Sequence, residues 1–162
     1  MAESAGLRFR YVVEHRDLDG RLTWRDEFEN LVTTAGKNLL GNVMFGATSK
    51  SAAWYLGLKG TGTAAVGDAM ASHAGWSEVT GYSESARQTL TLASFSSGTA
   101  NNSGSPAVFT INASVTVAGV FLVDNSTKGG ATGTLYSVGD FAGGSVSLSS
   151  GTITVNAFAL SF

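Results

Sequence analysis

The side chains best suited to catalysis or metal binding lie in one short stretch of the chain. His73 is five residues after Asp68 and five before Glu78, and the other histidine, His15, is far away in sequence. Divalent metals accept all three side-chain types, but structural and catalytic sites more often use close pairs such as H-x-x-x-H. The spacing favours a loop histidine satisfied by its neighbours, and we expect no metal site.

Acid–base and nucleophilic catalysis have no motif in this sequence. A Ser-His-Asp triad assembles in space and could recruit either histidine, but no G-x-S-x-G stretch is present. Asp68, Glu78 and Glu84 are candidates for the two carboxylates of a glycosidase. Such a pair needs a defined distance between the two carboxyl groups, which the positions in the sequence cannot show. In the glycine-rich stretches 60–63 and 129–134 a lysine precedes the glycines, the reverse of a phosphate-binding loop. We expect neither an enzyme nor a cofactor.

A set of aromatic residues, together with one arginine, is the strongest candidate for recognition in the middle of the chain. Trp, Tyr and Arg dominate both sugar-stacking platforms and the centres of protein interfaces. We favour an interface over a sugar site, and the alternative is structural, with Trp54 in the core and Trp76 closing one end. The set is Trp54, Tyr55, Trp76, Tyr82 and Arg87.

Charge is distributed unevenly along the 162 residues. Charged side chains make up 14% of the chain, where about 25% is usual, and twelve of them lie in the first 29 residues. In the last 75 residues only Asp124, Lys128 and Asp140 are charged. β-rich segments with so little charge aggregate unless they are closed, covered or assembled. We therefore expect this half of the chain to be buried against partners.

The same composition excludes several other classes of protein. The net charge of −2 and the pI near 5.6 give no electrostatic footprint for nucleic acid or anionic membranes. No cysteine is present, which excludes disulfide bonds and thiolate metal sites. Neither an apolar leader nor a run of 18 apolar residues is visible, so we expect synthesis in a cytoplasm without a membrane span.

The first 30 residues predict a charged β-hairpin. Alternation in residues 7–14 and 21–28 indicates two strands, and Asp17-Leu18-Asp19-Gly20 between them is a tight-turn signal. Charges of both signs suit cross-strand pairing on a solvated face, which we favour over a docking arm. We treat residues 1–30 as this hairpin and residues 31–162 as a β-sandwich domain.

One helix is predicted over about residues 34–45. Apolar side chains recur at helical spacing, Thr33 or Thr34 can cap the first turn, and Gly46 offers a left-handed stop. Leu40 and Phe45 broaden the apolar stripe. We therefore expect the helix to cover one edge or end of a sheet.

The other elements are strands, which makes about eight in all. They are predicted over residues 53–59, 87–95, 107–112 and 115–124, with Gly119 marking a bulge or a close approach. Residues 146–148 and 153–155 should pair as a final hairpin. The fold class is therefore all-β, an antiparallel sandwich that is jelly-roll-like, with an immunoglobulin-like sandwich left open.

Five segments carry a resemblance to a known protein family. They are Trp54-Tyr55-Leu56-Gly57-Leu58, residues 67–78, Tyr82-Ser83-Glu84, residues 107–112 and residues 119–123. Over about two-thirds of the chain, the sequence resembles small virion proteins of tailed bacteriophages, namely head decoration or cement proteins with a jelly-roll domain. The shared pattern is a virion-protein pattern and not a catalytic signature.

The resemblance implies a function by binding alone. A cement protein sits at junctions between subunits of the phage major capsid protein, on the outer surface of the virion, where many copies make small contacts collectively large. Self-association as a dimer or trimer is also implied. A tail or fibre module that binds host glycans through Trp76 and Tyr82 is the alternative. Because Arg and Trp suit charge complementarity and anchor burial, the candidate capsid-docking residues are Arg8, Arg10, Arg16, Arg21, Trp24 and Arg25.

Overall fold

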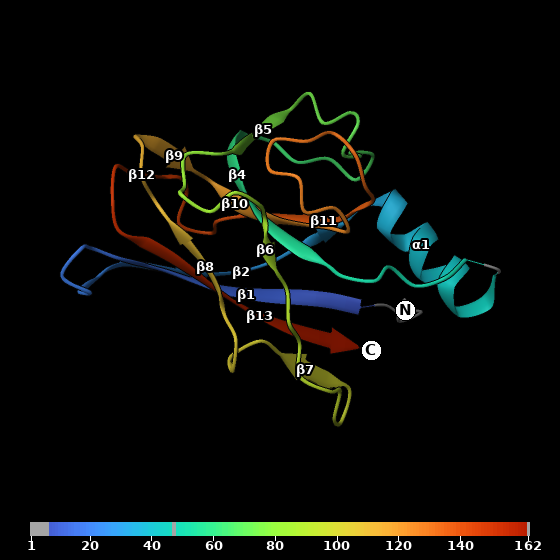
Figure 1. The fold of residues 1–162 in the computed structure, drawn as a ribbon. Coiled ribbons are helices and arrows are strands. Elements are labelled where there is room, and N and C mark those ends of the chain that lie inside the picture. The colour runs from blue at the N-terminus through green and yellow to red at the C-terminus, as the bar shows by residue number, and fades with distance from the viewer. Residues whose placement is uncertain (1–6, 47, 162) are drawn as a thin grey trace.

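The chain folds as an all-β antiparallel sandwich with one helix in its described part. The computed structural model describes residues 7–46 and 48–161, which form two main sheets and a small two-stranded sheet (Figure 1). The fold class predicted from the sequence is confirmed. Within these residues no helix has the length and apolar character needed to cross a membrane.

The first sheet is built on the predicted hairpin. β1 (Leu7–Arg16) and β2 (Leu22–Glu29) are joined by a tight turn in which Gly20 has φ +79°. β1 also pairs with β13 (Thr152–Ser161) along its whole length, so the hairpin is built into the sandwich. The strand order is β2-β1-β13-β7, and both β7 (Thr99–Asn101) and β8 (Ala107–Thr110) pair with β13.

The second sheet holds the most apolar strand, β10 (Gly119–Val123), at its centre. On one side lie β11 (Leu135–Asp140) and β3 (Leu31–Val32), and on the other lies β4 (Tyr55–Gly62). β5 (Trp76–Val79) and β6 (Gln88–Thr89) both pair with β4. Gly119 marks a close approach, as predicted, because a Cβ there would clash with the carbonyl oxygen of Gly139.

Three strand predictions are wrong in extent or pairing. The run at residues 115–124 breaks at Ala118 into β9 (Val115–Val117) and β10. The final hairpin does not form, because β12 (Val146–Leu148) pairs with β9 over three residues while β13 finds ten partners on β1. The strand expected over residues 87–95 shortens to β6, beyond which isolated bonds such as Leu90 N–H to the Trp54 carbonyl (2.8 Å) hold the chain.

Apolar side chains fill the space between the two sheets and also cover the far side of the second sheet. Tyr11 and Val13 of β1 are fully buried in the main core, as is Leu58 of β4. A second cluster lies beyond the second sheet, where Met70 and Trp76 pack with Phe121. The second sheet is therefore buried on both faces, whereas no described segment covers the outer face of the first sheet.

The helix α1 (Thr34–Phe45) contacts the second sheet through its first turns. Thr33 caps it as predicted, with Oγ1 accepting from the N–H of Gly36 at 3.0 Å. Gly36 is buried where a Cβ would clash with the carbonyl of Tyr136. The other end contradicts two predictions, since Gly46 has φ −102° and Phe45 is 88% exposed. Residues 36 and 45 lie half a turn apart around a helix, so Phe45 points away from the sheet.

Candidate functional site

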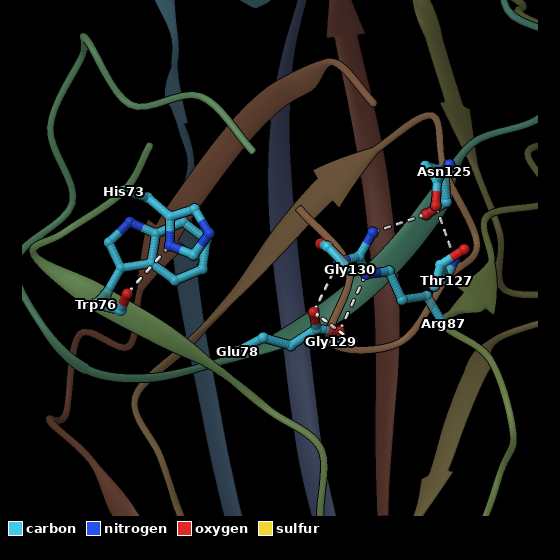
Figure 2. A network of polar contacts seen from close by, with 8 residues as sticks. All are labelled: His73, Trp76, Glu78, Arg87, Asn125, Thr127, Gly129 and Gly130. Carbon is cyan, nitrogen blue, oxygen red and sulfur yellow. Dashed lines mark hydrogen bonds and ion pairs between the residues drawn. The ribbon is translucent and has the colours of Figure 1, made fainter. Parts of the chain in front are cut away.

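Arg87 lies at the centre of a buried polar network (Figure 2). Its guanidinium donates to both carboxylate oxygens of Glu78 at 3.0 and 2.7 Å, and to the carbonyls of Asn125 and Gly130 at 3.0 and 2.7 Å. Glu78 also accepts from the Gly129 N–H at 3.0 Å. The side chain of Arg87 is fully buried and that of Glu78 is 6% exposed. The pair therefore fastens β5 to the loop that follows β10.

Two lysines serve the fold in the same way. The fully buried Lys59 contacts Asp140, with 2.6 Å between Nζ and Oδ1, and donates to two nearby backbone carbonyls at 3.1 and 2.6 Å. Lys128 donates to the backbone carbonyls of residues 82 and 84 at 2.9 and 2.7 Å. A buried ammonium group is costly unless it is paired in this way. Lys59 therefore links β4 to the end of β11, and Lys128 links the loop after β10 to the loop after β5.

Trp76 and Tyr82 lie inside the protein and do not form an open platform. Trp76 is 6% exposed, with His73 stacked on its ring at 4.2 Å and Phe121 at 5.3 Å between centroids. Its indole N–H donates to Asp68 at 2.8 Å. Tyr82 is 1% exposed. Neither ring offers the exposed face that stacking on a sugar requires.

The carboxylates considered for metal binding or acid–base chemistry are held by other groups. Asp68 accepts from Trp76, Glu78 is paired with Arg87, and Glu84 accepts from a backbone N–H at 3.0 Å. The buried ring of His15 is bonded to a threonine hydroxyl at 2.5 Å and to a backbone carbonyl at 2.9 Å. The part of the chain that the structure describes holds no group of three His, Cys, Asp or Glu side chains arranged for a metal.

Three tyrosines in the core have raised pKa values. Burial raises the pKa of Tyr136 to about 12. Burial is also the main cause that lifts the pKa values of Tyr11 and Tyr82 well above the usual range. A phenolate in these positions would lose its hydration, so the neutral form is strongly favoured. These rings contribute packing and not acid–base chemistry near neutral pH.

Four of the six predicted docking residues lie together on the outer face of the first sheet. Their side chains are 43–53% exposed, and each pairs with a glutamate of the same face. Exposed pairs of this kind contribute about 0–1 kcal/mol each, so a partner can exchange them at little cost. The pairs are Arg8–Glu29 (3.4 Å), Arg10–Glu27 (2.8 Å), Arg16–Glu14 (3.1 Å), Arg25–Glu14 (3.7 Å) and Arg25–Glu27 (3.5 Å).

The other two predicted docking residues, Arg21 and Trp24, lie off this face. Trp24 is half-buried and packs on Phe141 at 4.7 Å between centroids, so it closes the edge of the core. Arg21 is exposed at the turn between β1 and β2, which we call the hairpin tip (residues 17–22). Asp17 fixes this turn by accepting from the N–H groups of Asp19 and Arg21 at 3.0 and 2.9 Å.

A cavity of about 380 Å³, which we call the end cavity, opens beside α1. Leu39, Leu40 and Val43 of the helix line it, together with Trp54, which meets Tyr136 edge to face at 5.7 Å. The neighbouring Tyr55 packs against the second cluster, on the other side of the sheet. The structure therefore separates the aromatic residues that the sequence groups together.

The hairpin tip and the end cavity are two surfaces that the sequence reasoning missed. A sequence signal was present for the hairpin tip, whereas the end cavity follows from how α1 lies on the sheet. Leu18 stands in a tight turn, where it cannot reach the core, and it is 82% exposed. Gly36 on the buried side of α1 places Phe45 on the opposite side, so the end of the helix cannot be covered by the sheet.

The fold and these networks define a rigid antiparallel sandwich with one open, ion-paired sheet face. The sequence matches no protein-family model and no curated protein.

Proposed function

We propose that this chain is a structural virion protein of a tailed bacteriophage that binds the outside of the major capsid lattice. It stabilises the head by adding contacts between capsid subunits, without catalysis. The resemblance within residues 54–123 supports this proposal. The observation that carries it is the outer face of the first sheet, which is open while both faces of the second sheet are buried.

The chemistry of this face suits docking on another protein. Its ion pairs have partly solvated charges that can realign with charges on a partner, which favours specificity and a defined register. Arg10 bridges the charged and uncharged parts of the face, because its guanidinium lies 4.9 Å from the ring centroid of Phe158 on β13. Asn156 and Thr154 continue the half-exposed row along β13 without charge. The face therefore combines charge complementarity with a flat neutral strip.

Rigidity of the sandwich supports the same role. The buried cations Lys59 and Arg87 and the half-buried Lys128 fix strands and long connections to one another before any partner arrives. A preorganised surface loses little conformational entropy on binding. Repetition over a capsid lattice then makes a modest contact strong in total.

The experiment is the addition of purified protein to heads that lack it, followed by co-sedimentation and by heating with and without a chelator. We expect saturable binding and heads that resist higher temperatures. The variant Arg10→Glu should weaken binding by about tenfold or more. The control is the double variant Ala71→Glu with Ser72→Glu, on the loop over the second sheet. It makes the net charge more negative by the same amount as Arg10→Glu, and it should bind heads like the wild type.

A charge-swapped variant separates docking from folding. Arg10→Glu with Glu27→Arg keeps an ion pair between these two positions but inverts its direction, and Arg25 loses Glu27 while it keeps Glu14. Because exposed pairs contribute little to stability, this variant should fold normally and still bind heads poorly. Protein that ignores heads, or a swapped variant that binds them normally, would refute the proposal. Specific binding on a glycan array by protein that ignores heads would replace it with the fibre-module alternative.

A further inference from the structure

The strand β2 forms one edge of the first sheet. Within residues 7–46 and 48–161 it pairs with β1 alone, and the N–H of Asn30, at its end, donates to the Phe9 carbonyl at 3.1 Å, toward β1. The backbone groups of successive residues point to opposite sides of a strand. Those of Arg25, Glu27 and Glu29 therefore point to the open edge, where such a row is a template for another strand.

The sequence of β2 is complementary to itself in one antiparallel register, in which Asp26 lies opposite Asp26 of a second copy. On the outer face of the sheet, Arg25 of each copy then lies opposite Glu27 of the other. On the inner face, Trp24 of each copy lies opposite Phe28 of the other. Opposite charges and aromatic pairs placed in this way stabilise neighbouring strands. A second copy of this chain therefore suits the β2 edge on both faces.

Asp26 is the exception to this complementarity. It lies opposite the fully buried Val13 of β1, so it belongs to the core-facing side of β2. Its neighbours on that side are Trp24 and Phe28, which both pack on Phe141 at 4.7 and 5.4 Å between centroids. In the part of the chain that the structure describes, this half-buried carboxylate has no ion pair. Natural edge strands use inward-pointing charges of this kind to prevent strand addition.

Asp26 opposes pairing in two ways. One carboxylate oxygen accepts from the N–H of Glu27 at 2.8 Å, which is one of the edge donors that a new strand would use. The other oxygen accepts from the N–H of Gly143 at 3.0 Å, which holds the carboxylate in place. In the register above, Asp26 and its copy form a non-hydrogen-bonded pair with about 4.5 Å between Cα atoms. The two negative charges then repel each other directly.

We propose that the β2 edge is a pairing site for a second copy of this chain, and that Asp26 keeps this site closed in the free protein. One side chain at the centre of the contact then decides whether two sandwiches join into a single continuous sheet. The inference does not depend on capsid binding, because it concerns the edge of the sheet and is tested on the free protein.

The test is sedimentation velocity of the purified full-length protein over a range of concentrations at neutral pH. Asp26→Asn keeps the size of the side chain and one oxygen acceptor but removes the charge. We expect this variant to self-associate about tenfold or more tightly than the wild type. Asp19→Asn, the same change at the hairpin tip, is the matched control and should behave like the wild type. Urea unfolding of each variant shows that the fold is kept.

A mixture of chains separates charge repulsion from loss of structure. Asp26→Lys chains should repel one another as wild-type chains do, but mixed with wild type they should form one-to-one dimers, because opposite charges then meet. Because the chain has no cysteine, Asp26→Cys chains under mild oxidation should form a symmetrical disulfide more readily than Asp19→Cys chains. The proposal is overturned if Asp26→Asn associates no more than Asp19→Asn, or if the mixture of Asp26→Lys with wild type stays monomeric.

Discussion

Replacing Arg87 by methionine should be among the most damaging single changes in the protein. Methionine keeps much of the volume but removes donors to Glu78, Asn125 and Gly130, and it leaves the Glu78 carboxylate in a site where only 6% of it is exposed. Removing one partner of a buried pair costs about 3–5 kcal/mol. For a domain of this length, that corresponds to a fall in Tm of about 6–20 °C.

The assay is urea unfolding followed by the fluorescence of the tryptophans, with the same m-value required of every variant. Arg10→Met is the matched control, because it breaks an exposed pair and should cost about 0–1 kcal/mol. Arg87→Met with Glu78→Leu should recover part of the loss, since no buried charge is then left unpaired. A cost below about 1 kcal/mol for Arg87→Met, or equal costs for Arg87→Met and Arg10→Met, would refute the structural role of the network.

Two further predictions concern pH and α1. An unfolded tyrosine releases its proton near pH 10 and the folded Tyr136 near pH 12, so stability should be nearly level below pH 10 and then fall by about 2 kcal/mol by pH 12 from this residue alone. Tyr11 and Tyr82 act in the same direction, and level stability between pH 10 and 12 in urea unfolding would contradict this. Gly36→Ala should destabilise by about 1–3 kcal/mol, because its Cβ meets a backbone carbonyl, whereas Gly41→Ala, with open space around it, should stabilise by about 0.5–1 kcal/mol. The same unfolding assay measures both, and effects of equal sign would refute the packing of α1.

Local signals predicted the local structure well. Asp19-Gly20 fixes the first hairpin because the turn needs a positive φ, which glycine adopts freely, and Thr33 caps α1 because its hydroxyl reaches the Gly36 N–H. Strand partners were harder to predict. The alternation of Val146 and Leu148 is compatible with several neighbouring strands. β13 pairs with β1 because that register joins ten residue pairs, whereas β12 has only three residues to offer and pairs with β9.

The interior cations could not be predicted from spacing. Arg87 belonged to the predicted recognition set, but it is a buried structural residue. Two of its acceptors are backbone carbonyls in the distant loop after β10, and the other two are the carboxylate oxygens of Glu78 on β5. Lys59 sits in an alternating strand where a solvated outer face is the default interpretation. It is buried because residues 63–75 fold over that face, which periodicity does not reveal.

The predicted docking residues show the same division between local and long-range information. Alternation at the start of β1 correctly places Arg8 and Arg10 on one side of the strand, and Arg16, beyond the alternating stretch, lies on the same side. Trp24 alternates in the same way, but only the tertiary structure shows that its side of β2 meets Phe141. The outer face of the first sheet is exposed because the long loops pack over the second sheet instead, and this depends on the tertiary structure and not on the sequence of any one strand.

Binding of the purified chain to phage heads that lack it tests the central proposal most directly. We predict saturable co-sedimentation with the heads and a higher temperature of head disruption. Both effects should be lost in the Arg10→Glu variant and retained in the double variant Ala71→Glu with Ser72→Glu. Absence of binding at saturating protein, or binding that Arg10→Glu leaves unchanged, would contradict a capsid-docking role for the outer face of the first sheet.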